Sequence, residues 1–317
     1  MFSGDLHRAR EIARELRMLT ESNPHSPMGL LGNRPWAFIA FRMGEFREVE
    51  QIMGAFAAEA AQHSEPSLVE LAGHALAIRG NALLILGFPD QALALTNEAV
   101  TLGDPSQYVP MTTRGWAGSV RLSRGEFAAA EELLRQALSV GTERGFSALL
   151  ALWTTHLGQL SMARGQIQTG LAQVLSGLES SGNSFGDSFH YGLARAYAMA
   201  GRLDEAFAQV EQALLGTERS GEEIDLAGMH LLKAELLLRS DSIEAEKAFR
   251  TSIDFARRQE SKSWELRATT SLARWLDDQG KRDDAQAMLA EIYGWFTEGF
   301  DTADLREAKA LLDRLSA

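Results

Sequence analysis

The sequence of 317 residues contains no cysteine. This absence excludes disulfides, thiolate zinc sites, iron–sulfur clusters and cysteine nucleophiles. Proline is scarce, with 7 residues, and only 8% of the residues are aromatic. Such a composition favours helices over sheets. There is no unbroken run of 18 apolar residues, and the first residues lack the basic and then apolar order of a secretion signal, so we expect a soluble, cytoplasmic protein.

Basic residues are too few to balance the acidic ones. The chain has 31 lysines and arginines against 43 aspartates and glutamates, which gives a formal net charge of −12. An acidic surface repels phosphate backbones and anionic lipids. We therefore expect neither a nucleic-acid partner nor a membrane partner.

Several motifs that carry chemistry are missing as well. The sequence has no phosphate-binding P-loop, no GxGxxG dinucleotide motif and no HExxH zinc motif, and its seven histidines show no zinc-ligand spacing. Asp277-Asp278 and Asp283-Asp284 are the densest acidic sites, but Asp283 and Asp284 suit the first turn of a helix, and nothing in the sequence places two carboxylates across a cleft in unequal environments. We therefore predict no catalytic residue, no metal and no cofactor, and a protein that is not an enzyme.

What the sequence does contain is an internal repeat. An anchor glycine, with a small residue five positions later in most copies, recurs at intervals of 36 to 43 residues. Such a period is typical of a solenoid whose units pack against their neighbours. The anchors are Gly4, Gly44, Gly87, Gly125, Gly165, Gly201, Ser240 and Gly280.

Each repeat is predicted to form two helices. Apolar and small residues recur at helical spacing after each anchor, and the anchor glycine suits the left-handed conformation that ends a helix. A small residue also stands seven positions before most anchors, with Lys233 as the exception, and lets two helices approach closely. We therefore predict an all-α superhelix of about eight helical hairpins, formed by a single domain of residues 1–317 with its repeats at 36–292.

The two ends depart from the repeat. Residues 1–35 contain an incomplete first repeat, with a helix at about 6–19, and an irregular link rich in proline and glycine at 23–35. Because an open solenoid end leaves apolar surface in water, we expect a second subunit or an upstream domain to cover this first helix. Residues 293–317 are predicted to form an aromatic turn that docks a C-terminal capping helix, with Asp301 as its N-cap.

The spacing of the small residues resembles that of the tetratricopeptide-repeat (TPR) family, although the units here are longer. Four stretches (Leu86–Leu93, Glu143–Phe146, Leu231–Leu238 and, in most detail, Lys262–Leu315) are also similar to the C-terminal repeat regions of large bacterial predicted ATPases. Those proteins are often fused to adenylate/guanylate cyclase domains. The resemblance implies a right-handed superhelix that acts as the sensing or scaffolding segment of a nucleotide-driven switch.

If the chain resembles this family, the first helix of each unit lines the concave face. Positions thirteen, ten and six before the anchor share one side of that helix. The polar residues there are the candidate ligand- or peptide-binding residues: His74, Asn81, Ser119, Thr155, Gln159, Tyr191, Arg195, His230, Arg267 and Arg274. The last segment, from Tyr191 to Arg274, is cationic and aromatic, which suits a carboxylate, a small anionic ligand or an acidic peptide. The alternative is a groove wall that is polar only because water covers it.

Three functions remain open. The favoured one is a non-catalytic module that binds a protein, a peptide or a ligand on its concave face and regulates an attached or associated ATPase or nucleotide cyclase. The second is the small-molecule-sensing repeat domain of a signal-transducing ATPase regulator, and the third is a helical-toroid enzyme. An open, elongated curve would favour the first two functions, whereas a compact, closed form would favour the toroid.

Overall fold

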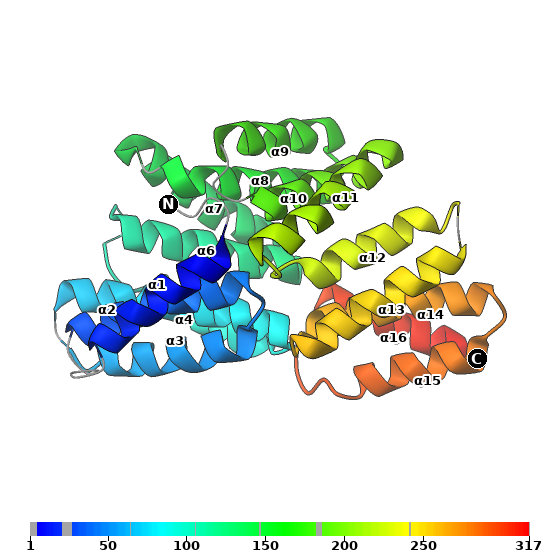
Figure 1. Cartoon of the computed structure of the whole chain (residues 1–317), viewed down its shortest axis with the longest axis horizontal. Coiled ribbons are helices and arrows are strands. Elements are labelled where there is room, and N and C mark those ends of the chain that lie inside the picture. The colour runs from blue at the N-terminus through cyan, green and yellow to red at the C-terminus, as the bar shows by residue number, and fades with distance from the viewer. Residues whose placement is uncertain are drawn as a thin grey trace.

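The computed structural model describes residues 5–20, 27–63, 65–104, 106–145, 147–181, 186–240 and 242–316. Within these ranges the chain forms sixteen helices and no strand. Antiparallel helix pairs follow one another along a superhelix (Figure 1). The predicted all-α superhelix is thus confirmed.

Helix α1 (Leu6–Thr20) precedes seven helical hairpins, and a single helix, α16 (Ala303–Ser316), follows them. Helix α16 packs on α14 and α15 and is the predicted capping helix. The hairpins are α2 (Pro27–Arg42) with α3 (Phe46–Ala60), α4 (Pro66–Leu86) with α5 (Pro89–Ala99), α6 (Tyr108–Arg124) with α7 (Phe127–Arg144), α8 (Ser147–Ala163) with α9 (Ile167–Ser181), α10 (Gly186–Met199) with α11 (Leu203–Ser220), α12 (Leu226–Leu237) with α13 (Ser242–Arg258), and α14 (Lys262–Asp278) with α15 (Arg282–Tyr293).

The six anchor glycines from Gly44 to Gly280 end the first helix of a hairpin, as predicted, whereas Gly4 lies outside the described residues. At Gly87, for example, φ is 98°, a left-handed conformation in which other residues are strained. The amide of Phe88 can then donate back to the carbonyl oxygen of Leu83 at 2.8 Å, so the helix end keeps its hydrogen bonds. The chain is thereby turned at once into the second helix.

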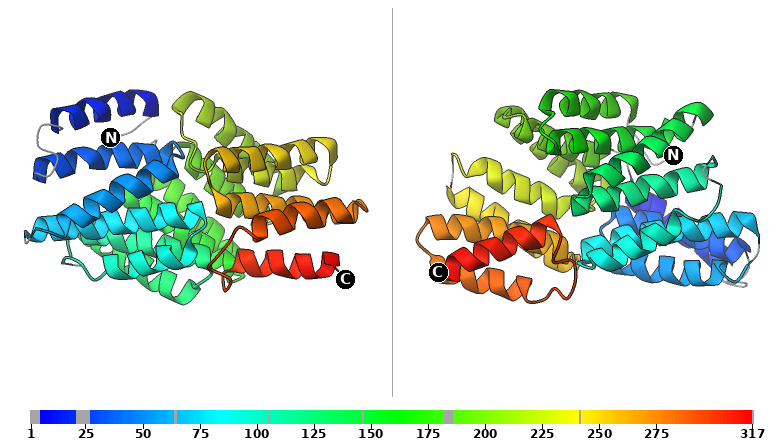
Figure 2. Two further views of the ribbon diagram at one scale, coloured as in Figure 1. Left: turned by 90° about the horizontal axis from the view of Figure 1, so that it is seen from below. Right: turned by 180° about the vertical axis from the view of Figure 1, so that it is seen from behind.

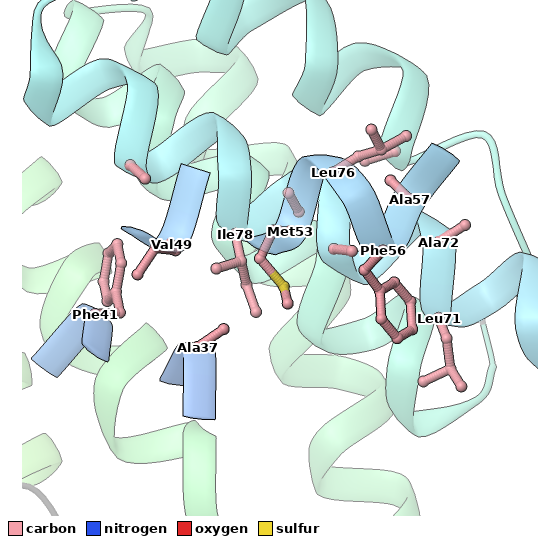
Figure 3. Close-up of a cluster of buried hydrophobic side chains, with 14 of the residues drawn as sticks. Ala37, Phe41, Val49, Met53, Phe56, Ala57, Leu71, Ala72, Leu76 and Ile78 are labelled. Carbon is pink, nitrogen blue, oxygen red and sulfur yellow. The ribbon is translucent and has the colours of Figure 1, made fainter. Parts of the chain in front are cut away.

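The small residue seven positions before the anchor lets the two helices of a hairpin touch. A Cβ atom on Gly80 would lie 2.8 Å from Cγ2 of Thr96 and 3.1 Å from the carbonyl oxygen of Ala92. A larger residue there would push α4 away from α5. The core continues from one hairpin to the next. Figure 3 shows the part built from Phe41 of α2, Val49, Met53 and Phe56 of α3, and Leu76 and Ile78 of α4.

The irregular link predicted for residues 23–35 is wrong for most of its length. Helix α2 begins at Pro27 and continues through Pro35. Proline is well suited to the first turn of a helix, but inside a helix it lacks the amide that would donate to the preceding turn. The helix persists because α2 packs against both α1 and α3, and tertiary packing outweighs local propensity. Residues 21–26 lie outside the described ranges.

The superhelix closes on itself, because the turn after α2 meets the connection between α11 and α12. Nε of Arg42 donates to Oε1 of Glu222 at 3.0 Å, and both side chains are buried. The backbone amides of Glu223 and Ile224 donate to the carbonyl oxygen of Arg42 at 2.9 and 3.0 Å. Early and late hairpins therefore lie side by side, as the two views of Figure 2 show.

The aromatic turn after α15 extends this closure to the second hairpin. The ring of Trp295 packs edge-on against that of Phe88, with centroids 5.4 Å apart. Oγ of Ser263 donates to the carbonyl oxygen of Leu84 at 2.5 Å. Phe296 joins the core under α16, as the predicted docking role requires. The turn therefore packs both against the second hairpin and against α16. The sequence predicts only the contact with α16.

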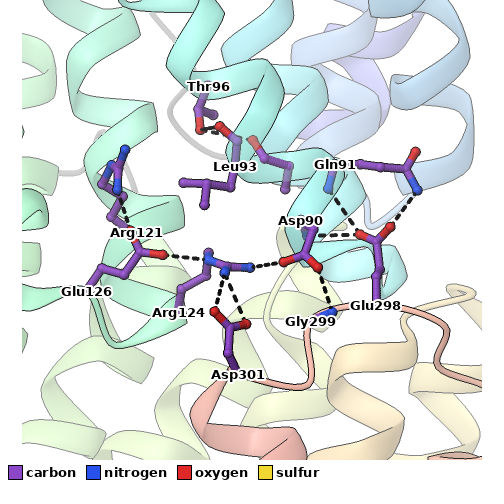
Figure 4. Close-up of polar contacts among 11 residues, drawn as sticks. Asp90, Gln91, Leu93, Thr96, Arg121, Arg124, Glu126, Glu298, Gly299 and Asp301 are labelled. Atoms are coloured by element: carbon purple, nitrogen blue, oxygen red, sulfur yellow. Dashed lines mark hydrogen bonds and ion pairs between the residues drawn. The ribbon is translucent and has the colours of Figure 1, made fainter.

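Charged groups complete the contact between α5, α6 and the segment before α16 (Figure 4). Oε1 of Glu298 accepts hydrogen bonds from the backbone amides of Asp90 and Gln91 at 2.9 and 3.1 Å, which supplies a cap for α5. Asp301, predicted to cap α16, instead pairs with Arg124 of α6 at 3.2 Å. Arg124 also pairs with Asp90 at 2.9 Å, so three chain segments meet at one buried guanidinium.

Helix α1 leaves part of its surface uncovered. Leu6 and Ala13 are buried against the rest of the fold, whereas Ile12, Leu16 and Leu19, spaced along another face, are 54%, 38% and 79% exposed. This is the apolar end face expected of a solenoid. Its coverage by a second subunit or an upstream domain stays a prediction.

Helix α4 is long and apolar enough to cross a membrane by length and composition, and no other helix in the described ranges passes that test. Within the fold, 67% of its apolar window is buried. Helix α4 contacts α3, α5, α6 and α14. Its hydrophobicity is thus explained by its place at the centre of the N-terminal hairpins.

Candidate functional site

A cavity of about 590 Å³ lies inside the closed superhelix. The first helices of the hairpins, α2 to α14, form most of its wall, and the α11–α12 and α15–α16 connections and the start of α16 also contribute. We call the first helices the inner helices from here on. The volume lies within the range usual for small-ligand sites.

Seven of the ten predicted binding residues line this cavity. They come from α4, α6, α8, α10 and α14, so the helical step of four does bring them onto one inner surface. Their role in binding stays a prediction. These residues are Asn81, Ser119, Thr155, Gln159, Tyr191, Arg195 and Arg267.

The other three predicted residues lie outside the cavity wall. Nη2 of Arg34 donates to Nδ1 of His74 at 3.1 Å, and burial, with the charge of Arg34, lowers the pKa of His74 to about 3. The ring of His230 stacks on Phe255 of α13, with centroids 5.1 Å apart. Arg274 forms an ion pair with the capping helix α16. Each of these side chains is used in packing neighbouring helices together.

Helix α12 has a different register from the one that the Ser240 anchor predicts. Glu235 lines the cavity, whereas His230 and Ala234 do not. Ala234 is fully buried, as a small residue at the helix contact should be, and it stands seven positions before residue 241. If residue 241 is taken as the anchor in place of Ser240, the residue seven positions earlier is Ala234, and Lys233 is no longer an exception to the repeat. That exception was the signal that could have identified Glu235 as a cavity residue.

Two of the three arginines in the wall are neutralised by partners. Arg42 pairs with Glu222 at 2.9 Å, and Nε of Arg267 lies 2.6 Å from Oδ2 of Asp304. Among the described residues, none forms an ion pair with Arg195. The predicted cationic segment is thus reduced to a single arginine without an ion pair.

Acidic residues that the repeat pattern missed face the same space. Burial and the neighbouring charge of Glu222 raise the pKa of Asp225 to about 6, while the charge of Arg195 and a hydrogen bond with Ser188 act in the opposite direction. Glu235 lines the cavity as well, and desolvation raises its pKa too, although its side chain is partly open to solvent. The cavity wall therefore carries four carboxylates and three guanidiniums, and is not the cationic surface that the sequence predicts.

A row of aromatic rings leads from the closure to the cavity wall. The ring centroids of Phe41 and Trp116 are 5.8 Å apart, and those of Trp116 and Trp153 are 5.3 Å apart, both in edge-to-face arrangements. His156 follows at 5.7 Å from Trp153. Edge-to-face contact is favourable for aromatic rings, so this row stiffens the wall between α2 and α8.

Among the described residues, Ser119 and His156 form a pair that could suggest nucleophilic chemistry. Oγ of Ser119 lies 3.0 Å from Nδ1 of His156, and burial, together with the charge of Arg195, lowers the pKa of His156 to about 4. A catalytic serine–histidine pair also needs an acidic group that orients the imidazole. No carboxylate contributes to the electrostatic surroundings of His156 among the described residues. The pair therefore has the features of a packing hydrogen bond between α6 and α8.

Two other types of reactive site find no support. A Gly-x-Ser-x-Gly string at residues 182–186 matches the pattern of a nucleophile elbow. That elbow needs a strand before its turn, whereas helix α9 precedes this string, and residues 182–185 lie outside the described ranges. In the part of the chain that the structure describes, no group of histidine and acidic side chains could hold a metal ion.

The arrangement of the helices matches that of known repeat proteins, although no family model and no curated protein matches the sequence. A signal-transduction ATPase (STAND protein) from Pyrococcus horikoshii, solved with its tetratricopeptide-repeat sensor, covers 98% of this chain at a TM-score of 0.53 and 12% identity. The chain is a TPR-like superhelix. This confirms the fold that the repeats predict.

Two further solved structures agree with this TPR-like superhelix. A chain of the APC/C hetero-tetramer Cut9–Hcn1 gives a TM-score of 0.65 at 14% identity and covers 98% of this chain. A Rap protein complexed with competence and sporulation factor gives 0.60 at 11% identity and also covers 98%. The match with this chain covers 96% of the length of the Rap chain, but only 54% of the hetero-tetramer chain and 50% of the STAND chain. The chain thus spans about half the length of the latter two proteins. At these identities the likeness establishes the fold alone.

Proposed function

We propose that this TPR-like superhelix is a non-catalytic interaction and sensor module of the cytoplasm. It binds a peptide, a segment of a partner protein or a small ligand inside its central cavity. The bound state then regulates an attached or associated ATPase or nucleotide cyclase.

The observation that carries this proposal is the state of Arg195 in the cavity. Arg195 lines the cavity with an exposed side chain, and no described residue forms an ion pair with it. An exposed guanidinium is hydrated, and a ligand can replace that water with charge-assisted hydrogen bonds. A ligand that supplies a carbonyl or carboxylate oxygen would satisfy this group.

The regulatory part of the proposal draws on two similarities. The resemblance of Lys262–Leu315 to the repeat regions of predicted ATPases points to a nucleotide-driven partner. The STAND ATPase described above carries a repeat sensor with the same fold. A ligand can drive such a switch only if it binds one state of the superhelix more tightly than the other. We propose that the two states are the closed form described above and a form in which the contacts that close the superhelix are broken.

The closed form is the shape expected of a helical-toroid enzyme, but the cavity chemistry favours binding. The Ser119–His156 pair lacks an orienting acid, and Glu222 is neutralised by Arg42. A general acid and a nucleophile need carboxyl groups in clearly different environments that face a common bond. The raised pKa values of Asp225 and Glu235 share one cause, burial, so no such division of roles is apparent.

Ligand binding is tested by following the melting temperature of the protein against a panel of peptides and metabolites. A ligand at one hundred times its Kd adds about 2.7 kcal/mol to the free energy of unfolding, which raises the melting temperature measurably. Arg195→Ala should abolish the increase. Arg274→Ala is the matched control, because Arg274 is paired with Glu307 outside the cavity wall. Equal loss in both variants, or binding that survives Arg195→Ala, would remove the cavity from the proposal.

A further inference from the structure

We infer that the ligand of the central cavity carries two positive charges about 15 Å apart, bound by Asp225 and Glu235 at the two ends of helix α12. The inference rests on the proposed function, since it names the chemistry of a ligand for the same cavity. The sign of the ligand's charge is opposite to that of the anionic ligand that the sequence alone suggests.

The first support is the charge that remains in the cavity after its ion pairs are formed. Arg42 neutralises Glu222, and Arg267 neutralises Asp304. Arg195 then stands against two carboxylates, Asp225 and Glu235, which have no ion-pair partner among the described residues. The wall therefore has an excess of negative charge, in a protein whose net charge is already −12.

The second support is the position of the two carboxylates on one helix. Asp225 immediately precedes α12 and Glu235 lies in its last turn, ten residues later. At a rise of 1.5 Å per residue, this places their backbones about 15 Å apart. An extended peptide advances about 3.3 Å per residue, so basic side chains four or five positions apart would span this distance.

The third support lies between the two acids, where aromatic rings cover the first turn of α12. The rings of Tyr191 and Trp264 are 6.5 Å apart, and both pack against Gly228, where a Cβ atom would collide with them. Tyr191, Trp264 and Gly228 all line the cavity. Apolar stems of lysine, arginine or a polyamine pack well along such rings, and their charged ends are attracted to the ring faces.

Arg195 is compatible with a basic ligand because its guanidinium can bind uncharged oxygen atoms. Its carbon Cζ lies 5.9 Å from the ring centroid of Tyr191, and its positive charge acts on both Asp225 and Glu235. A peptide laid along α12 would present backbone carbonyl oxygens there. A linear polyamine has no such oxygen. Removing Arg195 should therefore weaken the binding of a basic peptide but not that of a polyamine.

The test measures binding by titration calorimetry at low ionic strength, where charge contacts are least screened. The probes are blocked hexapeptides with two lysines four or five positions apart on an alanine background, the matching peptides with one lysine or with two glutamates, and spermine. We expect the dilysine peptides to bind at least tenfold more tightly than either peptide control. The double variant Asp225→Asn, Glu235→Gln should lose at least tenfold of this affinity.

The control is a second double variant, Asp278→Asn with Glu291→Gln, which removes the same charge from two exposed residues outside the cavity wall. It should bind the dilysine peptides as the unmodified protein does. An equal loss in both double variants would mean that only the overall charge matters, and would overturn the inference. Glu235→Gln alone changes an exposed side chain, so it provides the same test if the double cavity variant is unstable.

The remaining outcomes separate this inference from the proposed function. Binding of spermine, with or without the peptides, supports a doubly basic ligand, and Arg195→Ala should then weaken only the peptides. Binding of the glutamate peptides that depends on Arg195 would support the cavity as a binding site and overturn the basic ligand. If no dilysine probe and no spermine binds the unmodified protein, the inference is wrong.

Discussion

At the scale of single residues, Asp225 illustrates how the cavity departs from an ordinary protein surface. Its carboxyl group is surrounded by Glu222 from the same connection and by Ser188 and Arg195 from α10. Burial and the negative charge of Glu222 disfavour its ionised form, so its pKa rises to about 6. An acid that holds its proton more tightly in the folded state than in the unfolded state makes folding less favourable once the pH is high enough to ionise it.

We therefore expect Asp225→Asn to stabilise the protein at neutral pH. The cost of ionising Asp225 is absent below about pH 4, grows between pH 4 and 6, and is complete above pH 6. A pKa raised by about two corresponds to an upper limit of about 3 kcal/mol, and the partial exposure of the side chain makes about 1–2 kcal/mol a better expectation. Urea unfolding of both proteins from pH 4 to pH 8 measures the difference. A difference that does not change with pH would show that Asp225 is not buried in this way.

At the scale of helices, glycine residues in the inner helices differ in how much room their neighbours leave for a side chain. A Cβ atom on Gly115 of α6 would collide with the indole ring of Trp153, which is fully buried in α8. A Cβ atom on Gly192 of α10 would meet nothing closer than Cγ2 of Thr155 at 3.5 Å, an ordinary contact. Both glycines are in helical backbone, and both are replaced by alanine at no conformational cost.

The two substitutions should therefore change stability in opposite directions. Gly192→Ala gains helix propensity, by about 0.5–1 kcal/mol, because the alanine fits. Gly115→Ala gains the same propensity but overpacks the contact with Trp153, which costs about 1–3 kcal/mol and gives a net loss. Thermal unfolding of the two variants compares them directly. Equal effects would mean that α6 and α8 can separate without cost, and that Gly115 is not a packing requirement.

These helix contacts are also the part of the structure that is easiest to predict from the sequence. The anchor glycines, the small residues at the helix contacts and the four-residue step are local features, so they predict both the hairpins and seven of the cavity residues. Glu235 was missed because one misaligned residue in α12 turns the predicted face away from the real one. The continuation of α2 through Pro35 was missed because packing against α1 and α3, and not local propensity, holds that helix together.

At the scale of the whole molecule, the closure of the superhelix was beyond the reach of a repeat pattern. Arg42 and Glu222 are 180 residues apart, and each is an ordinary charged residue close to a helix end. Asp301 and Glu298 likewise have partners about two hundred residues earlier. A period reports how each unit packs on the next one, whereas closure depends on the accumulated curvature of many units. The same closure turns a concave surface into the central cavity, and it places the acidic residues of the α11–α12 connection and of α16 in the cavity wall.

The buried pair of Arg42 and Glu222 should then be a principal link in this closure. Removing one partner leaves the other charge buried and uncompensated, so Arg42→Ala is expected to cost about 3–5 kcal/mol. Arg47 provides a matched control, because it also spans the closure but pairs with Glu260 at 3.3 Å on the exposed surface. Arg47→Ala should cost less than about 1 kcal/mol. Urea unfolding measures both losses.

The shape of the molecule gives the second readout of this prediction. If the pair holds early and late hairpins together, Arg42→Ala should increase the radius of gyration measured by small-angle scattering, while Arg47→Ala leaves it unchanged. The double variant Arg42→Leu, Glu222→Leu removes both charges and should recover much of the lost stability, since apolar residues often replace a buried ion pair without cost. A closed shape in Arg42→Ala would assign the closure to the Trp295–Phe88 contact and the Arg124 cluster instead, and the ligand-driven switch would then have to act there.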